Sequence, residues 1–478
     1  MKSERTKPIW IRLLFALAAA GAIAPCVARG QSVSIVESEF QSQAWLPFEE
    51  EELSADEFAD LVSASQPPVP PAEGTQDAGD PPPRTFTSPF LSARRPVRIA
   101  RVPDMFGDFF AAGGQLSIDR GPTDIVIIIP GPAGNFVGIF HFDGGSLVTD
   151  VPLAGGACNA KIAENNKAVA QDRAYLLYNH FENALSGQSS PPTGPVEQFD
   201  VDRYTLGFEK TLFDCYTSVE VRVPFTRTFE FNSFNSAAAF ESYGGEAGNA
   251  AVILKRQIYS TDNTAVAMGC GVGLPTGGDF RTQASFFGVG LLGPGIPFPF
   301  TDTLSIAVRN KAVHAMPFFA VSHQATDELF FHLFLQGDFP DRGHPVTASA
   351  DTLFLPATLD MPLGEYREQN LAFVDFSAGV WLYEDECAPV VRGIAGLLEL
   401  HYTTTLNDTS TVEAELPPGT AVRLTNPRNR FEIWNLTTGL HFALAGDSSL
   451  RVATVLPLME GEGRTFDSEL WVSFNKQL

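Results

Sequence analysis

Apolar and polar side chains alternate along the end of the chain, residues 464–478. One face of an extended chain holds Leu470, Val472 and Phe474, and the opposite face holds Glu469, Ser473 and Asn475. This period of two predicts a β-strand, although Trp471 shares the polar face. The sequence stops within the strand, and in an open sheet such a strand would be an unpaired edge. We therefore expect it to pair with the first strand of a closed barrel, at about residues 172–181.

The same alternation recurs from about residue 172 onward and predicts twelve strands in all. Their approximate ranges are 172–181, 199–212, 216–225, 250–260, 263–274, 313–323, 328–339, 371–383, 391–405, 430–444, 448–458 and 466–478. Most of them span 10 to 15 residues, whereas strands of globular proteins usually have about five or six. A strand tilted across a bilayer needs about 9 to 11 residues. The pattern predicts an all-β fold, a closed antiparallel transmembrane β-barrel of about 12 strands (10–14).

Charged residues occupy one face of several predicted strands. Glu220 and Arg222 alternate with Val221 and Val223, and Glu399 and His401 alternate with Leu398 and Leu400. A charge is costly against lipid, so we expect the polar face to line a wet lumen. The candidate lumen-facing residues are Arg203, Glu209, Glu220, Arg222, Glu399 and His401. They could form a charged constriction that filters solutes or a mesh of ion pairs that fills the lumen.

The links between the predicted strands also alternate in length. Residues 261–263 and 447–448 are short enough for tight hairpins, whereas residues 276–312, 340–370 and 406–429 are long and polar or rich in Gly and Pro. Short turns on one side and long loops on the other are typical of outer-membrane barrels. We expect the short turns to face the periplasm.

Residues 102–171 precede the barrel and are expected to form short strands or a plug-like lead-in. Within PDMFGDFF, the spacing of Met105, Phe106, Phe109 and Phe110 predicts the apolar face of a short helix. We expect this helix to dock on or inside the folded part. Residues 124–129 and 135–142 predict two short strands, which Gly-Pro punctuation separates.

The first 30 residues predict an export signal. A basic start precedes a short apolar run at 13–24, and Ala28 and Gly30 suit a cut before Gln31. The run is short for a membrane-anchoring helix. Cys26 raises the alternative of a lipoprotein, but Pro25 stands where that signal needs a small residue. Residues 31–101 are acidic and rich in Pro, and we expect a disordered arm.

Net charge, cysteines and sequence motifs limit the partners and reactions that the protein can have. The net charge of −24 argues against a nucleic-acid partner. After the cut, Cys158, Cys215, Cys270 and Cys387 show no CxxC spacing, and their pairing stays open. The sequence contains no nucleophile elbow, P-loop, HExxH or dinucleotide fingerprint. We expect no enzyme, no cofactor and no metal site, although His314, His323 and His332 lie on neighbouring predicted strands and could approach one another.

Several long stretches resemble known barrels. The stretches NLTTGLHFALA, LRVATVLPLM and FDSELWVSFNKQL resemble the closing hairpins of bacterial outer-membrane β-barrels, and GCGVGLPTG at 269–277 resembles strand ends of hydrophobic-compound transporters. PDMFGDFF, DRAYLLYNHFENA, DVDRYTLGFEKTLFD and ELHYTTTL together resemble an uncharacterised barrel family of budding, compartmented aquatic bacteria. The resemblance covers roughly residues 100–478. Such barrels usually end in Phe or Tyr, whereas this chain ends in Leu478.

These observations predict a barrel of the cell outer membrane that acts as a passive channel or transporter for small solutes. A structural or interaction barrel with a filled lumen is the alternative, and a soluble exported β-sandwich is a third. The expected partners are outer-membrane lipids, the outer-membrane assembly machinery and a periplasmic partner of the Pro-rich arm. The sequence leaves open the solute, the state of the pore and the oligomeric state.

Overall fold

A computed structural model describes residues 97–478, except for 109–112, 132–133, 153–160, 191–192, 213–214, 227–229, 235–237, 244–246, 293–295, 352–360 and 418. The predicted signal at 1–30, nearly all of the predicted disordered arm, Cys26 and Cys158 lie outside the described residues. Helix α3 (Val97–Arg101) and the 3₁₀ helix η3 (Gly461–Gly463) are short. No helix in the described part of the chain has the length and apolar character to cross a membrane.

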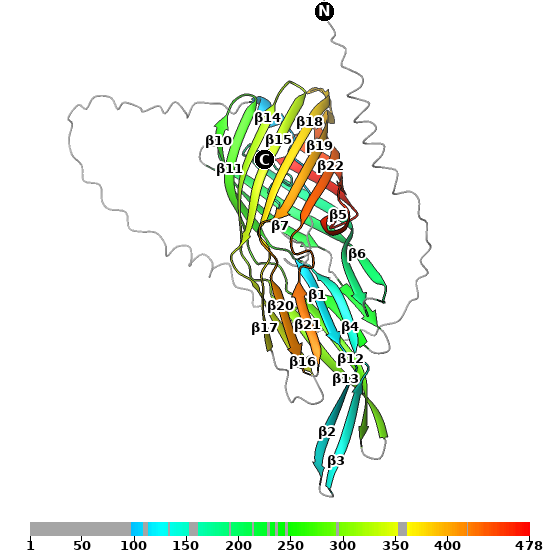
Figure 1. Cartoon of the computed structure of the whole chain (residues 1–478). Helices are drawn as coiled ribbons and strands as arrows, with labels where there is room; N and C mark the ends of the chain where they lie inside the picture. The colour runs from blue at the N-terminus through cyan, green and yellow to red at the C-terminus, as the bar shows by residue number, and fades with distance from the viewer. Residues whose placement is uncertain are drawn as a thin grey trace, which may run out of the picture. The chain divides into compact units, whose positions relative to one another are not determined.

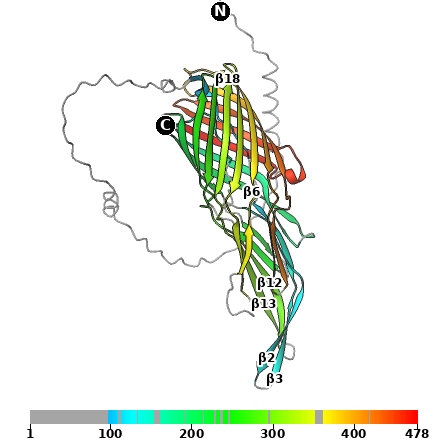
Figure 2. The same cartoon turned by 60° about the vertical axis from the view of Figure 1, so that its left-hand side comes forward.

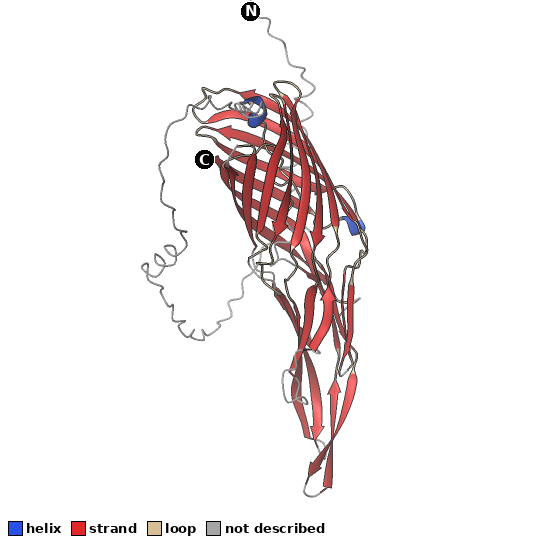
Figure 3. Ribbon diagram, turned by 90° about the vertical axis from the view of Figure 1, so that its left-hand side faces the viewer, coloured by secondary structure: helices blue, strands red, loops and turns tan. Residues whose placement is uncertain are grey.

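Twelve antiparallel strands form a closed barrel, as predicted, and each lies at a predicted position. They are β5 (Arg173–Ser189), β6 (Val196–Leu212), β7 (Thr217–Thr226), β10 (Ala251–Ser260), β11 (Thr264–Gly273), β14 (His314–Gln324), β15 (Leu329–Pro340), β18 (Leu371–Glu384), β19 (Val391–Thr405), β22 (Glu432–Leu444), β23 (Ser448–Pro457) and β24 (Ser468–Gln477). Strand β5 closes the barrel because it pairs with both β6 and β24. The strands lie side by side and cross the barrel obliquely (Figures 1 and 3).

The pairing of the last strand with the first confirms the expectation for the chain end. Ser468 lies opposite Glu182, and Gln477 lies opposite Arg173, with a continuous register between them. The closure leaves no free edge on β24 within the barrel. The open β-sandwich alternative for the whole chain is therefore wrong.

The two ends of the barrel differ in the length of their connections. At the short-turn end, tight links join β6 to β7, β10 to β11, β14 to β15, β18 to β19 and β22 to β23. The start of β5 and the end of β24 lie at the same end, because they pair there. At the opposite end, strand hairpins are inserted between successive barrel strands, and we call it the sandwich end.

The outer surface of the barrel wall is apolar. The exposed large apolar side chains come from eleven of the twelve barrel strands and include Leu176, Leu206, Val221, Leu254, Met268, Phe319, Leu335, Phe376, Leu398, Val452 and Phe474. Their sequence neighbours on the other face are buried, as with Leu398 at 41% exposed and Glu399 at 0%. Such an outward apolar band is the surface that lipid solvates.

Strands outside the barrel form a two-layer body, here called the sandwich. One layer is β1 (Gly114–Arg120), β4 (Gly145–Val151), β20 (Thr411–Leu416) and β21 (Thr420–Thr425), joined to the barrel sheet through β4 and β5. The other is an eight-stranded sheet of β2 (Thr123–Gly131), β3 (Gly134–Phe142), β8 (Glu230–Phe234), β9 (Ala238–Tyr243), β12 (Phe280–Leu292), β13 (Ile296–Val308), β16 (His344–Asp351) and β17 (Met361–Tyr366). Figure 2 shows these strands beyond one end of the barrel.

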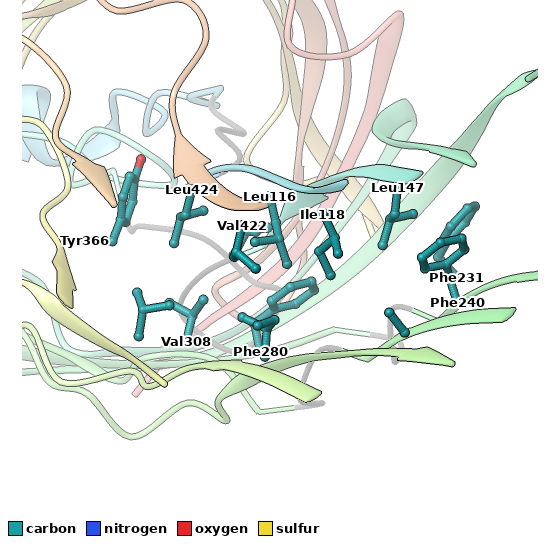
Figure 4. Packing of buried hydrophobic residues seen from close by; sticks show 14 of the residues in the cluster. Leu116, Ile118, Leu147, Phe231, Phe240, Phe280, Val308, Tyr366, Val422 and Leu424 are labelled. Carbon is teal, nitrogen blue, oxygen red and sulfur yellow. The ribbon is translucent and has the colours of Figure 1, made fainter. Parts of the chain in front are cut away.

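An apolar core lies between the two layers of the sandwich. Leu116 and Val422 from one layer face Phe280 and Val308 from the other (Figure 4). A charged pair is buried in the sandwich: Arg120 NH1 lies 2.6 Å from Asp302 Oδ2. The guanidinium of Arg120 also lies 4.0 Å from the ring centre of Phe142.

The composition of the three long links led us to expect irregular loops, but the links form strand hairpins. Residues 276–312, 340–370 and 406–429 contain the hairpins β12–β13, β16–β17 and β20–β21. In the link 276–312, Pro297 and Pro299 indicated a loop. They lie in the part of β13 that pairs only with β12, since the pairing with β16 spans Thr303 to Val308. A proline is tolerated on such an edge because its missing N–H is not needed there.

Candidate functional site

Two segments of the chain before β5 lie inside the barrel. They are residues 102–108 and 161–171, here called the first and second inner segments, and their side chains are buried. The backbone N–H of Met105 donates to Asn166 O at 2.9 Å, and that of Asn165 donates to Phe106 O at 3.1 Å. The two segments are therefore paired with each other as well as with the wall.

The first inner segment is not the helix that its apolar spacing predicted. Residues 103–108 carry no regular secondary structure, and Phe109 and Phe110 lie outside the described residues. Gly107 has φ +87°, and a Cβ added there would lie 2.5 Å from the Cα of Glu164. The close approach of the two segments therefore requires glycine at this position. Met105 and Phe106 are fully buried, so this part of the expected docking is inside the barrel.

Glu399 and His401 on β19 hold the first inner segment. The carboxylate of Glu399 accepts hydrogen bonds from Phe106 N at 2.9 and 3.1 Å and from Gly107 N at 3.0 Å. His401 Nδ1 lies 3.2 Å from Asp108 Oδ1 and 2.9 Å from Asp375 Oδ1. Glu399 thus binds the backbone of the first inner segment, and His401 binds the carboxylate of Asp108 in it.

Four other predicted wall residues contact the second inner segment. Arg203 NH2 lies 2.5 Å from Glu164 Oε1, and Glu209 Oε1 accepts from Gln171 N at 3.2 Å. Arg222 NH1 donates to Lys161 O at 2.8 Å.

Glu220 contacts the same segment and ties its neighbours together. Its Oε2 lies 3.4 Å from Asn166 Nδ2, and its Oε1 accepts from Arg222 Nε at 3.0 Å and from Tyr175 OH at 2.7 Å. All six predicted side chains are buried on the inner side of the wall, and each contacts an inner segment.

Further interior residues extend this network beyond the six that the sequence singled out. Arg173 Nε lies 2.9 Å from Glu209 Oε2, and Lys255 Nζ lies 2.8 Å from Glu209 Oε1. Arg451 NH1 donates to Asn165 Oδ1 at 2.6 Å. Strand alternation could have found Lys255 and Arg451, because both lie on inward positions of strands predicted from the sequence.

The buried interior charges nearly balance. Away from the junction with the sandwich, the acids among the described interior residues are Asp104, Asp108, Glu164, Glu209, Glu220, Asp375, Glu399 and Glu469. The bases are Lys161, Lys167, Arg173, Arg203, Arg222, Lys255 and Arg451, with His401 between Asp108 and Asp375. Burying charge is tolerable only when it is paired and hydrogen-bonded. The inner segments supply partners for some of the wall charges, and other wall charges pair with one another.

A cavity of about 730 Å³ opens at the short-turn end. Its lining includes Arg101 and Asp104 from the chain that leads into the barrel, and Trp381, His441 and Asp447 from the wall and one short turn. The cavity ends against the first inner segment.

The three histidines that were expected to approach one another lie apart. His323 is exposed on the outer face and contacts Thr264 Oγ1, whereas His332 is buried and contacts Ser322 Oγ. His314 lies at the sandwich end beside Asp338. His323 is separated from the other two because side chains alternate between the two faces of the wall. His314 and His332 both face inward but lie at different heights, since His314 is opposite Pro340 and His332 is opposite Ser322.

One interior group, Asp108, Asp375 and His401, has the composition of a cation site. Lys161 Nζ lies 2.6 Å from Asp375 Oδ1 and also pairs with Asp108. The ammonium of Lys161 therefore stands where a cation would bind.

No protein-family model matches the sequence, and no curated protein matches it either. Among solved structures, the NanC porin is similar at 8% identity and a TM-score of 0.32, covering 63% of this chain and 97% of that one. The toluene transporter TodX of Pseudomonas putida is similar at 12% identity and a TM-score of 0.36, with 76% and 89% covered. The toluene transporter TbuX of Ralstonia pickettii is similar at 12% and 0.36, with 80% and 94% covered.

The fold and the interior define a class: a closed twelve-stranded β-barrel whose lumen is occupied by its own chain and whose strands continue into a β-sandwich at one end. The predicted kinship with barrels of budding aquatic bacteria stays a prediction. The role of the barrel therefore has to be read from its own residues.

Proposed function

We propose that this protein is an outer-membrane barrel that is closed at rest by its two inner segments and that presents the sandwich outside the cell. The observation that carries the proposal is the set of contacts between the wall and the inner segments. All six predicted wall charges are engaged by residues 102–108 and 161–171. The barrel then serves as a membrane anchor and the sandwich as the part that meets its surroundings.

The outward apolar band supports placement in a membrane. A strand of ten or more residues with an apolar outer face and paired charges inside suits a bilayer and not water. In outer-membrane barrels the short turns face the periplasm and the long connections face outward. This rule places the sandwich outside the cell and residue 97, near the short turn at Asp262, on the periplasmic side.

The sandwich carries an exposed apolar ladder, which supports a role in interaction. On one face of the eight-stranded sheet, Val126 lies opposite Ile139, and Ile139 lies opposite Leu291. These side chains are 60%, 43% and 42% exposed. Contiguous exposed apolar side chains of this kind mark contact surfaces.

The experiment is thiol labelling in intact cells with a membrane-impermeant maleimide. A cysteine in place of the exposed Ile128 on β2 should react in intact cells. The native Cys215 and Cys387, exposed in short turns, should react only after the outer membrane is permeabilised. All labelling variants should carry Cys158→Ser, because Cys158 is a thiol outside the described residues whose labelling could not be interpreted. Labelling of Cys387 in intact cells, with Ile128→Cys protected, reverses the orientation and overturns the proposal.

A passive channel for small solutes is the second candidate function, and the cavity at the short-turn end favours it. A solute would enter the cavity beside Asp104 and His441 and then need the first inner segment to move. The solute class stays open. Conductance across a planar bilayer distinguishes this candidate from a permanently closed anchor.

The partners expected from the sequence follow from the same placement. Outer-membrane lipids would contact the apolar band, and the assembly machinery would insert the barrel. A periplasmic partner of the N-terminal arm remains a proposal, because it depends on residues outside the described part.

A further inference from the structure

Three buried side chains converge where the barrel meets the sandwich. His314 is the first residue of β14, His344 is the first residue of β16, and Glu368 lies just before β18. One ligand-type atom from each lies within 4.8 Å of the others. We propose that His314, His344 and Glu368 bind a divalent transition-metal ion, with Zn²⁺ as the best match.

The distances between the donor atoms suit one ion. His344 Nε2 lies 3.1 Å from Glu368 Oε1, and His314 Nε2 lies 3.6 Å from Glu368 Oε2. Zinc sits about 2.0–2.2 Å from nitrogen and carboxylate ligands in a tetrahedral site, so neighbouring ligand atoms are about 3.4 Å apart. Each imidazole nitrogen lies close to that distance from one of the two oxygens of the Glu368 carboxylate.

Both imidazoles are oriented with one nitrogen toward the site. His314 Nδ1 lies 2.7 Å from Asp338 Oδ1, which leaves Nε2 as the unprotonated nitrogen when Nδ1 donates. His344 Nδ1 lies 3.2 Å from Arg309 O, which gives the same arrangement. A carboxylate or carbonyl behind each histidine is the usual outer support of a metal site.

An unused hydrogen-bonding atom points to a missing ligand. His314 is almost fully buried, and its Nε2 makes no hydrogen bond among the described residues. The same holds for Asp338 Oδ2. Buried polar atoms are nearly always satisfied in native proteins. A metal ion would use the lone pair of Nε2 that no protein group uses.

The competing arrangement is an ion-pair cluster without metal. The backbone N–H of Lys311 also lies 3.2 Å from His344 Nδ1. If it donates there, the proton sits on Nε2 and bonds to Glu368, and no ion is needed. The two arrangements differ in whether the folded protein takes up metal, which can be measured.

The donor set indicates the class of ion. Two imidazole nitrogens and a carboxylate suit Zn²⁺, Co²⁺, Ni²⁺ or Fe²⁺, whereas Mg²⁺ and Ca²⁺ prefer oxygen ligands alone. An ion here would cross-link β14 of the barrel, β16 of the sandwich and the segment before β18. It would therefore stabilise the junction against opening.

The experiment uses the detergent-extracted, metal-stripped full chain and a competition titration with Zn²⁺ and a chromophoric chelator. We expect one tight site, and Co²⁺ in its place should give visible absorption from nitrogen and oxygen ligands. His344→Ala and Glu368→Gln should weaken binding by more than about 100-fold. Asp338→Asn should weaken it by about 10- to 100-fold, as loss of an outer support does.

His323→Ala is the matched control, because His323 lies on the same strand as His314 but on the outer face. It should bind Zn²⁺ as the unaltered protein does. Heat-modifiable migration in gels verifies that each variant is folded. Glu368→Gln keeps the side-chain shape and therefore serves if an alanine variant misfolds. Failure of the folded protein to take up one Zn²⁺, or equal uptake by His344→Ala and Glu368→Gln, establishes the ion-pair cluster and overturns the proposal.

Discussion

The ring of Phe106 packs edge-on against the indole of Trp471, with ring centres 5.0 Å apart and planes at 82°. Phe106 belongs to the first inner segment and Trp471 to the last barrel strand. The Arg451 guanidinium lies within 4.6 Å of one ring centre and 4.9 Å of the other. Trp471 shares the polar face of β24 because that face meets a packed segment of chain.

Removing either ring should loosen the inner segment. Phe106→Ala and Trp471→Ala should each lower the free energy of unfolding by about 3–5 kcal/mol, the usual loss for a buried aromatic. The double variant should fall short of the sum by about 0.5–1.5 kcal/mol, the range for aromatic pairs. These losses can be measured by denaturant unfolding in detergent. Gel migration detects unfolding of all variants, and tryptophan fluorescence also detects it for Phe106→Ala.

Phe474→Ala is the control for this cycle. Phe474 lies on the same strand but on the outer face, 46% exposed, so in detergent its loss should be small. Equal losses for Phe474→Ala and Trp471→Ala would contradict the interior contact.

Glu399 should be the wall residue on which the first inner segment depends most. In Glu399→Gln one carboxylate oxygen becomes an amide that cannot accept from the backbone N–H groups of Phe106 and Gly107. A hydrogen bond to a charged group contributes about 1.5–3 kcal/mol, and we expect a loss of that size. Limited proteolysis should also cut near residues 102–108 sooner.

Glu413→Gln provides the matched comparison for Glu399→Gln. Glu413 pairs with Arg423 on the exposed surface of the sandwich, with side chains 62% and 58% exposed. Exposed pairs contribute about 0–1 kcal/mol, so this change should leave stability and proteolysis nearly unaltered. If Glu399→Gln behaves no differently, Glu399 does not hold the segment.

Deleting residues 468–478 should prevent assembly. The deletion removes ten residue pairs with β5 and exposes an edge on β5 and on β23. Each unpaired backbone group in a bilayer costs several kcal/mol, and no side-chain change offsets several of them. Heat-modifiable migration and membrane yield give the readout, and near-normal yield of the truncated chain would refute closure through β24. Leu478→Phe should be neutral or improve yield, since Leu478 is exposed at the strand end.

Strand length and alternation predicted the barrel well, because each barrel strand alternates between lipid and interior along its own sequence. Glu220 and Arg222 on β7 illustrate this, since Val221 between them and Phe225 further along the strand face outward. Of the sandwich, only β2 and β3 lie where short strands were predicted. The hairpin β12–β13 was missed because it contains Pro297 and Pro299, which indicate a loop when read locally. The hairpins β16–β17 and β20–β21 were missed because their strands have only 6 to 8 residues.

The partners of the wall charges could not be predicted from the sequence. Glu399 bonds to residues 292 and 293 positions away, and His314 meets His344 and Glu368 from other strand ends. Such pairings follow from barrel closure and the path of the inner segments, which leave no local spacing motif. The apolar spacing of Met105 and Phe106 correctly predicted that this segment docks on the folded part. It wrongly predicted a helix, because a buried extended segment can show the same spacing.

Conductance across a planar bilayer tests most directly whether the inner segments close the lumen. Purified full-length protein should insert and show no steady conductance. Gly107→Ala places a Cβ against the backbone of Glu164 and should produce openings, whereas Gly446→Ala should not. Gly446 has a similar positive φ of 71° but open space around it, so it controls for backbone strain. A steady open-pore conductance of the unaltered protein that Gly107→Ala leaves unchanged would contradict a lumen closed by residues 102–108 and 161–171.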